Sequence, residues 1–230
     1  MSSQTNTPEA ALSDVVSNAH IVNERIQACA EAAGRPNGSV RLVAVSKTKP
    51  AEAIQQLYDA GYRHFGENYL QELTEKAAIL PKDINWHFIG HLQSSKASKI
   101  TKDVSNLYLL ETIDSEKLAN KVNNARSTAG LPPLKVFIQV DTSGEATKSG
   151  VDTGSELLSL ATFITEQCPH LRLAGLMTIG KWIFILGGNV LINVRNFLAL
   201  TLCVLLFFIP LWMSIWMGVP VCCIDLFCFH

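Results

Sequence analysis

The chain has 230 residues, with 19 basic and 20 acidic side chains and a formal net charge of -1. That length allows one large domain or two small ones. Because basic and acidic side chains nearly cancel, the chain lacks the excess positive charge that is typical of nucleic-acid-binding proteins. A composition of 48% apolar and 17% charged residues excludes wholesale disorder.

The charges are unevenly distributed along the chain. After Lys181 only Arg195 and Asp225 are charged. We therefore expect a folded body over residues 8–180 and an apolar tail of a different kind over 181–230.

The polar N-terminus lacks the apolar core of a signal peptide and the Arg-rich pattern of a transit peptide, so we expect a cytoplasmic protein. Cys29 and Cys168 are far apart in sequence and are expected to be reduced. Cys222 and Cys223 are adjacent, without the C-x-x-C spacing of a zinc or redox site. The sequence therefore predicts no metal site.

Helical and strand patterns alternate along the body. Leu12, Val15, Val16 and Ala19 begin an amphipathic pattern with spacings of three and four. Pro50 opens a second helix and Gly61 ends it. The predicted helices cover 8–33, 51–60, 69–79, 94–101, a segment capped by Asp114 and ending near 129, and 155–167. The predicted strands cover 40–46, 63–67, 85–90, 106–113, 134–141 and 171–179.

Six such alternations with short connections indicate a parallel α/β architecture. An open doubly wound sheet and a (β/α)8 barrel both fit. The turn after the first strand, at residues 46–50, has no glycine, unlike the phosphate-binding turn of a Rossmann sheet. Polar residues follow the strands, as at the rim of a barrel where active sites are built: Lys47, Glu67, Asn68, His91, Glu111, Asp141, Thr142 and Thr178. We therefore favour a TIM-type (β/α)8 barrel that is incomplete, with about six strands present. In such an open barrel the first and sixth strands each lack a neighbour.

Lys47 is the first candidate for chemistry, because it closes the first predicted strand. A lysine at the mouth of a barrel is partly desolvated, and a neighbouring cation such as Lys49 also favours the neutral amine. A neutral amine can attack an aldehyde, which is what a pyridoxal phosphate Schiff base requires. The alternative is a solvated lysine at the end of a strand.

Three other polar groups have two interpretations each. Glu67–Asn68 could orient the lysine or hold a ring substituent, or Asn68 could be a helix N-cap. His87 and His91 are four residues apart, but they flank a strand end and face differently, so a metal site is disfavoured. Residues 142–144 could bind an anion through backbone N–H groups, or form an ordinary turn.

Several blocks of the body resemble the pyridoxal phosphate homeostasis protein family. They occur in the family's order over roughly residues 19–180: LVAVSKTKP at 42–50, FGENY at 65–69, WHFIGHLQ at 86–93, VDTSGE at 140–145, KSG at 148–150 and GLMTIG at 175–180.

The resemblance implies a single-domain barrel similar to the N-terminal domain of bacterial alanine racemase. Lys47 matches the lysine that carries pyridoxal 5'-phosphate as an aldimine, and Asn68, His87 and Met177 match positions near the cofactor. The family is thought to bind the cofactor and hand it on, which implies PLP-dependent apoenzymes as partners and no enzymatic activity. Racemisation needs acid/base groups on both faces of the ring, and racemases supply one of them from a second domain and subunit.

The resemblance ends after Gly180. The family's later segments, which hold the cofactor phosphate and an arginine near the pyridine nitrogen, do not appear, so we expect weakened cofactor binding. Residues 196–224 carry no charge and are long enough to span a bilayer. We favour foreign sequence, such as translation past a splice junction, over a functional membrane anchor.

Three hypotheses follow. The first is a cytosolic protein of pyridoxal phosphate homeostasis that binds the cofactor on Lys47. The second is an amino-acid racemase-like enzyme of the same fold, which needs a catalytic group opposite Lys47. The third is a membrane-anchored remnant that binds no cofactor.

Overall fold

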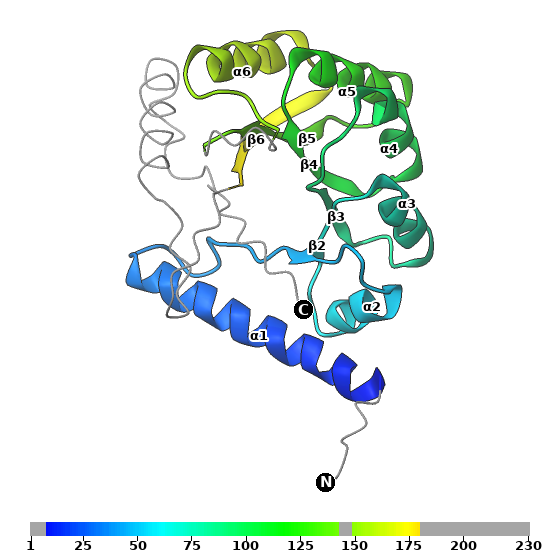
Figure 1. The fold of residues 1–230 in the computed structure, drawn as a ribbon, viewed down its shortest axis with the longest axis vertical. Helices are drawn as coiled ribbons and strands as arrows, with labels where there is room; N and C mark the ends of the chain where they lie inside the picture. Colours follow the sequence, from blue (N-terminus) through cyan, green and yellow to red (C-terminus); the bar gives the residue numbers. More distant parts are fainter. Residues whose placement is uncertain (1–7, 143–148, 180–230) are drawn as a thin grey trace. The chain divides into compact units, whose positions relative to one another are not determined.

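The computed structural model describes residues 8–142 and 149–179 (Figure 1). The helices are α1 (Pro8–Ala32), α2 (Ala51–Asp59), α3 (Leu70–Ile79), α4 (Ala97–Asp103), α5 (Glu116–Thr128) and α6 (Ser155–Gln167), and a 3-10 turn, η1 (Ser94–Lys96), precedes α4. The strands are β1 (Ala44–Val45), β2 (His64–Glu67), β3 (Asn85–Phe88), β4 (Leu107–Ile113), β5 (Leu134–Val140) and β6 (Leu171–Thr178).

The strands form a six-stranded sheet in chain order, β1-β2-β3-β4-β5-β6. The pairings β1–β2, β2–β3 and β5–β6 are parallel. A helix lies in the connection between each pair of successive strands, so the predicted strand–helix alternation is confirmed. Within the described residues, β1 and β6 each pair with a single strand of this sheet.

The chain divides into two compact units, whose described parts are residues 8–90 with 102–109, and residues 91–101 with 110–142 and 149–179. In the first unit β2 and β3 are in register, with Phe65 opposite Trp86 and Glu67 opposite Phe88. Phe65, Trp86 and Phe88 are almost completely buried. Parallel strands buried in this way need apolar residues on both faces, which explains the near-continuous apolar runs in the sequence.

Helix α2 ends where glycine permits a left-handed backbone. Gly61 has φ 96°, and its N–H donates to the carbonyl of Tyr58 while that of Tyr62 donates to the carbonyl of Leu57. This pair of hydrogen bonds is a Schellman motif. It turns the chain from α2 into β2, as predicted from the glycine.

The second unit is built around β5 and β6, which α6 contacts (Figure 1). Its core includes Val136, Ile138, Leu160 and Ile164. Ser155 and Gln167 bound α6 in the structure as they do in the sequence-based prediction.

Two local predictions are wrong. The first strand is Ala44–Val45 rather than 40–46. Within the described residues it has one neighbour, β2, and two residue pairs complete the ladder. The N-cap of α5 is Ser115, not Asp114: Ser115 lies directly before the first helical residue, and its Oγ accepts a hydrogen bond from Leu118 N–H at 3.3 Å.

The tail over 181–230, including the apolar stretch 196–224, lies outside the described residues. Within the described part of the chain, no helix has the length and apolar character needed to cross a bilayer. The boundary at residue 180 and the nature of the tail therefore remain predictions.

Candidate functional site

Lys47 lies in a tight turn that immediately follows β1. The turn runs from Ser46 to Lys49 and is closed by a 3.1 Å hydrogen bond from Lys49 N–H to the Ser46 carbonyl. Lys47 and Thr48 are its two central residues, and the Lys47 side chain is half-buried. The structure thus places this amine at the carboxyl end of a parallel strand, as predicted.

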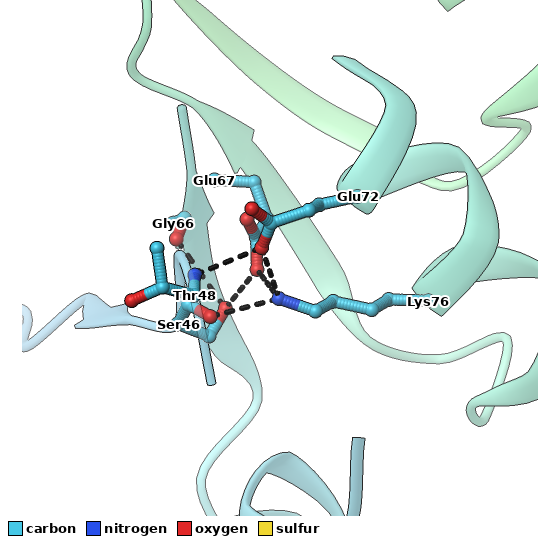
Figure 2. Close-up of polar contacts among 6 residues, drawn as sticks. All are labelled: Ser46, Thr48, Gly66, Glu67, Glu72 and Lys76. Atoms are coloured by element: carbon cyan, nitrogen blue, oxygen red, sulfur yellow. Dashed lines mark hydrogen bonds and ion pairs between the residues drawn. The ribbon is translucent and has the colours of Figure 1, made fainter. Parts of the chain in front are cut away.

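A cluster of charged and polar side chains lies directly beside this turn (Figure 2). Lys76 of α3 donates from Nζ to Glu67 Oε1 at 2.8 Å and to Glu72 Oε2 at 2.9 Å. It also donates to the Ser46 carbonyl at 2.8 Å. Ser46 Oγ donates to Glu67 Oε1 at 2.7 Å. We call Ser46, Glu67, Glu72 and Lys76 the α3 cluster.

The α3 cluster is largely shielded from water. Glu67 is 0% exposed and Lys76 is 8% exposed. Burial raises the pKa of Glu67, and the hydrogen bonds from Lys76 and Ser46 lower it by less. Burial also raises the pKa of Glu72, but there the hydrogen bonds from Lys76 and from Thr48 N–H prevail, so that its pKa is lowered.

Thr48 has an uncommon backbone conformation. Its φ is 61°, and within the described residues it is the one non-glycine residue with positive φ. A β-branched residue in this region is a genuine outlier. Its N–H donates to Glu72 Oε2 at 2.8 Å, so a carboxylate of α3 holds this residue in place.

Asn68 follows β2 at the same edge of the sheet as Lys47. It is not the N-cap of α3, because that position belongs to Tyr69. The Asn68 carbonyl lies against Gly90, where an added Cβ would come within 2.0 Å of the oxygen. Asn68 Oδ1 is buried and has no hydrogen-bond partner among the described residues.

His87 lies within β3 and is 2% exposed. Its Nε2 is 2.9 Å from His64 Nδ1, so one of these nitrogens donates to the other. The Tyr108 ring packs against both imidazoles, with centroid distances of 5.3 Å to His87 and 5.1 Å to His64. No group of three or more His, Cys, Asp or Glu side chains in the described residues is arranged to hold a metal ion.

Met177 belongs to the second unit and is 2% exposed. It lies opposite Gln139 in the β5–β6 register. The neighbouring Thr178 hydroxyl is 2.7 Å from the Thr142 hydroxyl, which ties the ends of the two strands together. The anion site suggested at 142–144 falls largely outside the described residues.

Buried Glu111 of β4 also belongs to the second unit. Burial raises its pKa to about 8.

The sequence predicts Lys47 and Asn68 at one sheet edge and suggests Glu67 as a residue that could orient the lysine, but it does not single out the other residues that surround them. Lys76, His64 and Tyr108 are not among the candidate residues of the sequence analysis. One signal was available. Glu72 and Lys76 are four residues apart and so lie on one side of α3, next to buried Leu73 and Ala77. A lysine on an apolar helix face needs a buried partner.

Comparison with known proteins places the chain in a protein family. Residues 19–181 match the alanine racemase N-terminal domain family. A pyridoxal phosphate homeostasis protein of Schizosaccharomyces pombe is 54% identical over 143 residues, which are 62% of this chain and 59% of the relative. The chain therefore spans about three fifths of the length of this relative.

Two solved structures extend the likeness. A protein of unknown function from Bifidobacterium adolescentis superposes with a TM-score of 0.76 at 31% identity, over 94% of this chain and 86% of the other. PipY of Synechococcus elongatus PCC7942, solved with PLP bound, has a TM-score of 0.56 at 33% identity, over 71% and 72% of the two chains. The predicted α/β fold of the alanine racemase N-terminal barrel type is confirmed.

Proposed function

Because the chain belongs to the pyridoxal phosphate homeostasis protein family, we propose that it binds pyridoxal 5'-phosphate reversibly through the amine of Lys47. Its role is then to hold the reactive cofactor within the cell and pass it on. The observation that carries this proposal is the half-buried Lys47 in a tight turn at the carboxyl edge of the sheet.

The residues around Lys47 fit the aldehyde end of the cofactor. Ser46 and Glu67 point to the α3 side of the sheet, where they contact Lys76. Lys47 is the next residue after Ser46, at the first central position of the turn, and its side chain is half-buried. When bound, pyridoxal 5'-phosphate supplies an aldehyde that condenses with a primary amine, and an anchored, half-shielded lysine supplies that amine.

Asn68 supports the same site. Its buried Oδ1 has no hydrogen-bond partner among the described residues, and burying such an acceptor unpaired costs about 1–3 kcal/mol. A hydroxyl group of a ligand would satisfy it. We propose Asn68 as a contact to a polar substituent of the ring, and keep His87 and Met177 as contacts suggested by the family resemblance.

The matched part of the chain ends at residue 181. The family resemblance assigns phosphate binding to later segments, and the sequence of residues 182–230 does not show them. We therefore propose weaker cofactor binding by this chain than by its longer relatives, since a phosphate dianion depends on a cradle of N–H donors.

We propose a binding protein of the cytosol rather than an enzyme, with PLP-dependent apoenzymes as recipients. Exchange of an amino acid's α-proton with solvent deuterium, in a cofactor-loaded sample, tests the racemase alternative. No exchange is expected. Carbonate extraction of cells that express the chain tests the membrane-anchored alternative, for which resistance to extraction is the signature.

The binding proposal is tested with the purified 230-residue chain. The chain is incubated with pyridoxal 5'-phosphate and reduced with borohydride, and the modified lysine is mapped by mass spectrometry. One dominant adduct on Lys47 is expected. An adduct spread over exposed lysines such as Lys102 and Lys117, with no preference for Lys47, contradicts the proposal.

A further inference from the structure

The two peptide units that flank Lys47 are both held by side chains of α3. On one side, the Ser46 carbonyl accepts from Lys76 Nζ at 2.8 Å. On the other, Thr48 N–H donates to Glu72 Oε2 at 2.8 Å. Figure 2 shows these contacts from α3 reaching Ser46 and Thr48, which come directly before and after Lys47 in the sequence.

Glu72 and Lys76 are also joined to each other, at 2.9 Å. Lys76 is fixed in turn by Glu67 of β2 at 2.8 Å. The turn is therefore held to a helix and a neighbouring strand as well as by its own Ser46–Lys49 hydrogen bond.

The conformation that these contacts hold is one that the sequence does not favour. Thr48 has φ 61°, which glycine or asparagine adopts readily and a β-branched residue does not. Strained backbone of this kind persists where surrounding contacts over-determine it, and it occurs preferentially at functional sites. Thr48 N–H donates to the Glu72 carboxylate. Hydrogen bonds to a charged acceptor are among the stronger hydrogen bonds in proteins.

We infer that Glu72 and Lys76 are positioning residues that set the reactivity of Lys47 by clamping the strained turn on either side of it. This inference rests on the proposed role of Lys47 in binding pyridoxal 5'-phosphate. Neither residue touches the cofactor in this scheme. They fix the direction in which the Lys47 side chain leaves the backbone, and a misplaced nucleophile loses rate steeply.

The test compares how fast Lys47 reacts with pyridoxal 5'-phosphate in the full chain and in Glu72→Ala. Adducts are trapped by borohydride at intervals and measured by mass spectrometry. Glu75→Ala is the matched control, because Glu75 is an exposed carboxylate of the same helix. We expect Glu72→Ala to slow modification of Lys47 by about tenfold, and Glu75→Ala to change it by less than about twofold. Glu72→Gln keeps an acceptor for Thr48 N–H and should recover most of the rate.

Thr48→Gly separates positioning from general stability. Glycine adopts positive φ without strain, so the turn then depends less on Glu72. The slowing caused by Glu72→Ala should therefore shrink in the Thr48→Gly background. Lys76→Met combined with Glu67→Gln removes the other side of the clamp without leaving a buried carboxylate, and should slow Lys47 in the same way as Glu72→Ala.

Two results overturn the inference. One is a folded Glu72→Ala protein that reacts at Lys47 as fast as Glu75→Ala. The other is an equal loss of rate from Glu72→Ala with and without the Thr48→Gly substitution. Failure of the proposed function gives a different result, which is the absence of a preferred Lys47 adduct in the chain without substitutions. In that case, competitive acetylation of Lys47 in the same variants still tests the clamp without any cofactor.

Discussion

Replacing Lys76 by methionine should strongly destabilise the protein while keeping the apolar stem of the side chain. The change removes three hydrogen bonds, to Glu67, Glu72 and the Ser46 carbonyl. It also leaves Glu67, which is 0% exposed, without its cation. Removing one partner of a buried ion pair typically costs about 3–5 kcal/mol.

The lower end of that range applies here, because two features limit the loss. Burial already raises the pKa of Glu67, so its carboxyl takes up a proton more easily than an exposed one. Ser46 Oγ still donates to Glu67 at 2.7 Å. We therefore expect a loss of about 3 kcal/mol, which at a urea m-value of about 2 kcal/mol/M lowers the unfolding midpoint by about 1.5 M.

The assay is urea unfolding at about pH 7 followed by circular dichroism. Lys117→Met, which removes an exposed helix lysine, is the control and should shift the midpoint by less than about 0.3 M, as is usual for surface changes. Adding Glu67→Gln to Lys76→Met removes the stranded carboxylate and should restore part of the stability. The reasoning is refuted if Lys76→Met unfolds at the same midpoint as Lys117→Met.

Three further changes test other parts of the structure. Burial raises the pKa of Glu111 from 4.5 to about 8. The neutral carboxyl therefore stabilises the fold fully below pH 4.5, and this stabilisation is lost as pH rises through 8. At about 1.36 kcal/mol per pH unit, the loss in free energy of unfolding is at most about 5 kcal/mol. Glu111→Gln should therefore raise the free energy of unfolding at about pH 8.5 and leave it nearly unchanged at about pH 4, whereas a uniform effect at both pH values, like that of exposed Glu166→Gln, contradicts this. Gly90→Ala should cost about 1–3 kcal/mol in the same assay, because the new Cβ would meet the Asn68 carbonyl, and a fully stable variant would show that this close approach is absent. Ser115→Ala should cost about 1 kcal/mol through loss of the N-cap of α5, and no change in thermal midpoint would argue against the cap.

The order of helices and strands could be predicted because local patterns determine it. Helix α6 has Gly154 before it and an apolar periodicity through Leu157, Leu160 and Ile164, and its predicted bounds agree with the structure. The extent of β1 could not be predicted in the same way, because strand length depends on pairing with a neighbour rather than on the strand's own residues.

The site was predicted in part for a similar reason. Lys47 and Asn68 follow strands, and the carboxyl ends of parallel strands share one edge, so their position follows from the order of elements. The burial of Lys76 depends on Glu67, nine residues away on another element. The strain at Thr48 depends on Glu72 of α3, and threonine itself gives no hint of positive φ.

The most direct test of cofactor binding at Lys47 compares the chain with its Lys47→Ala variant. Both are mixed with pyridoxal 5'-phosphate, freed of excess cofactor and examined by absorption spectroscopy, with Lys49→Ala as the neighbouring control. We expect a yellow protein-bound chromophore in the chain and in Lys49→Ala, and its loss in Lys47→Ala. An unchanged chromophore in a folded Lys47→Ala protein would contradict the central claim.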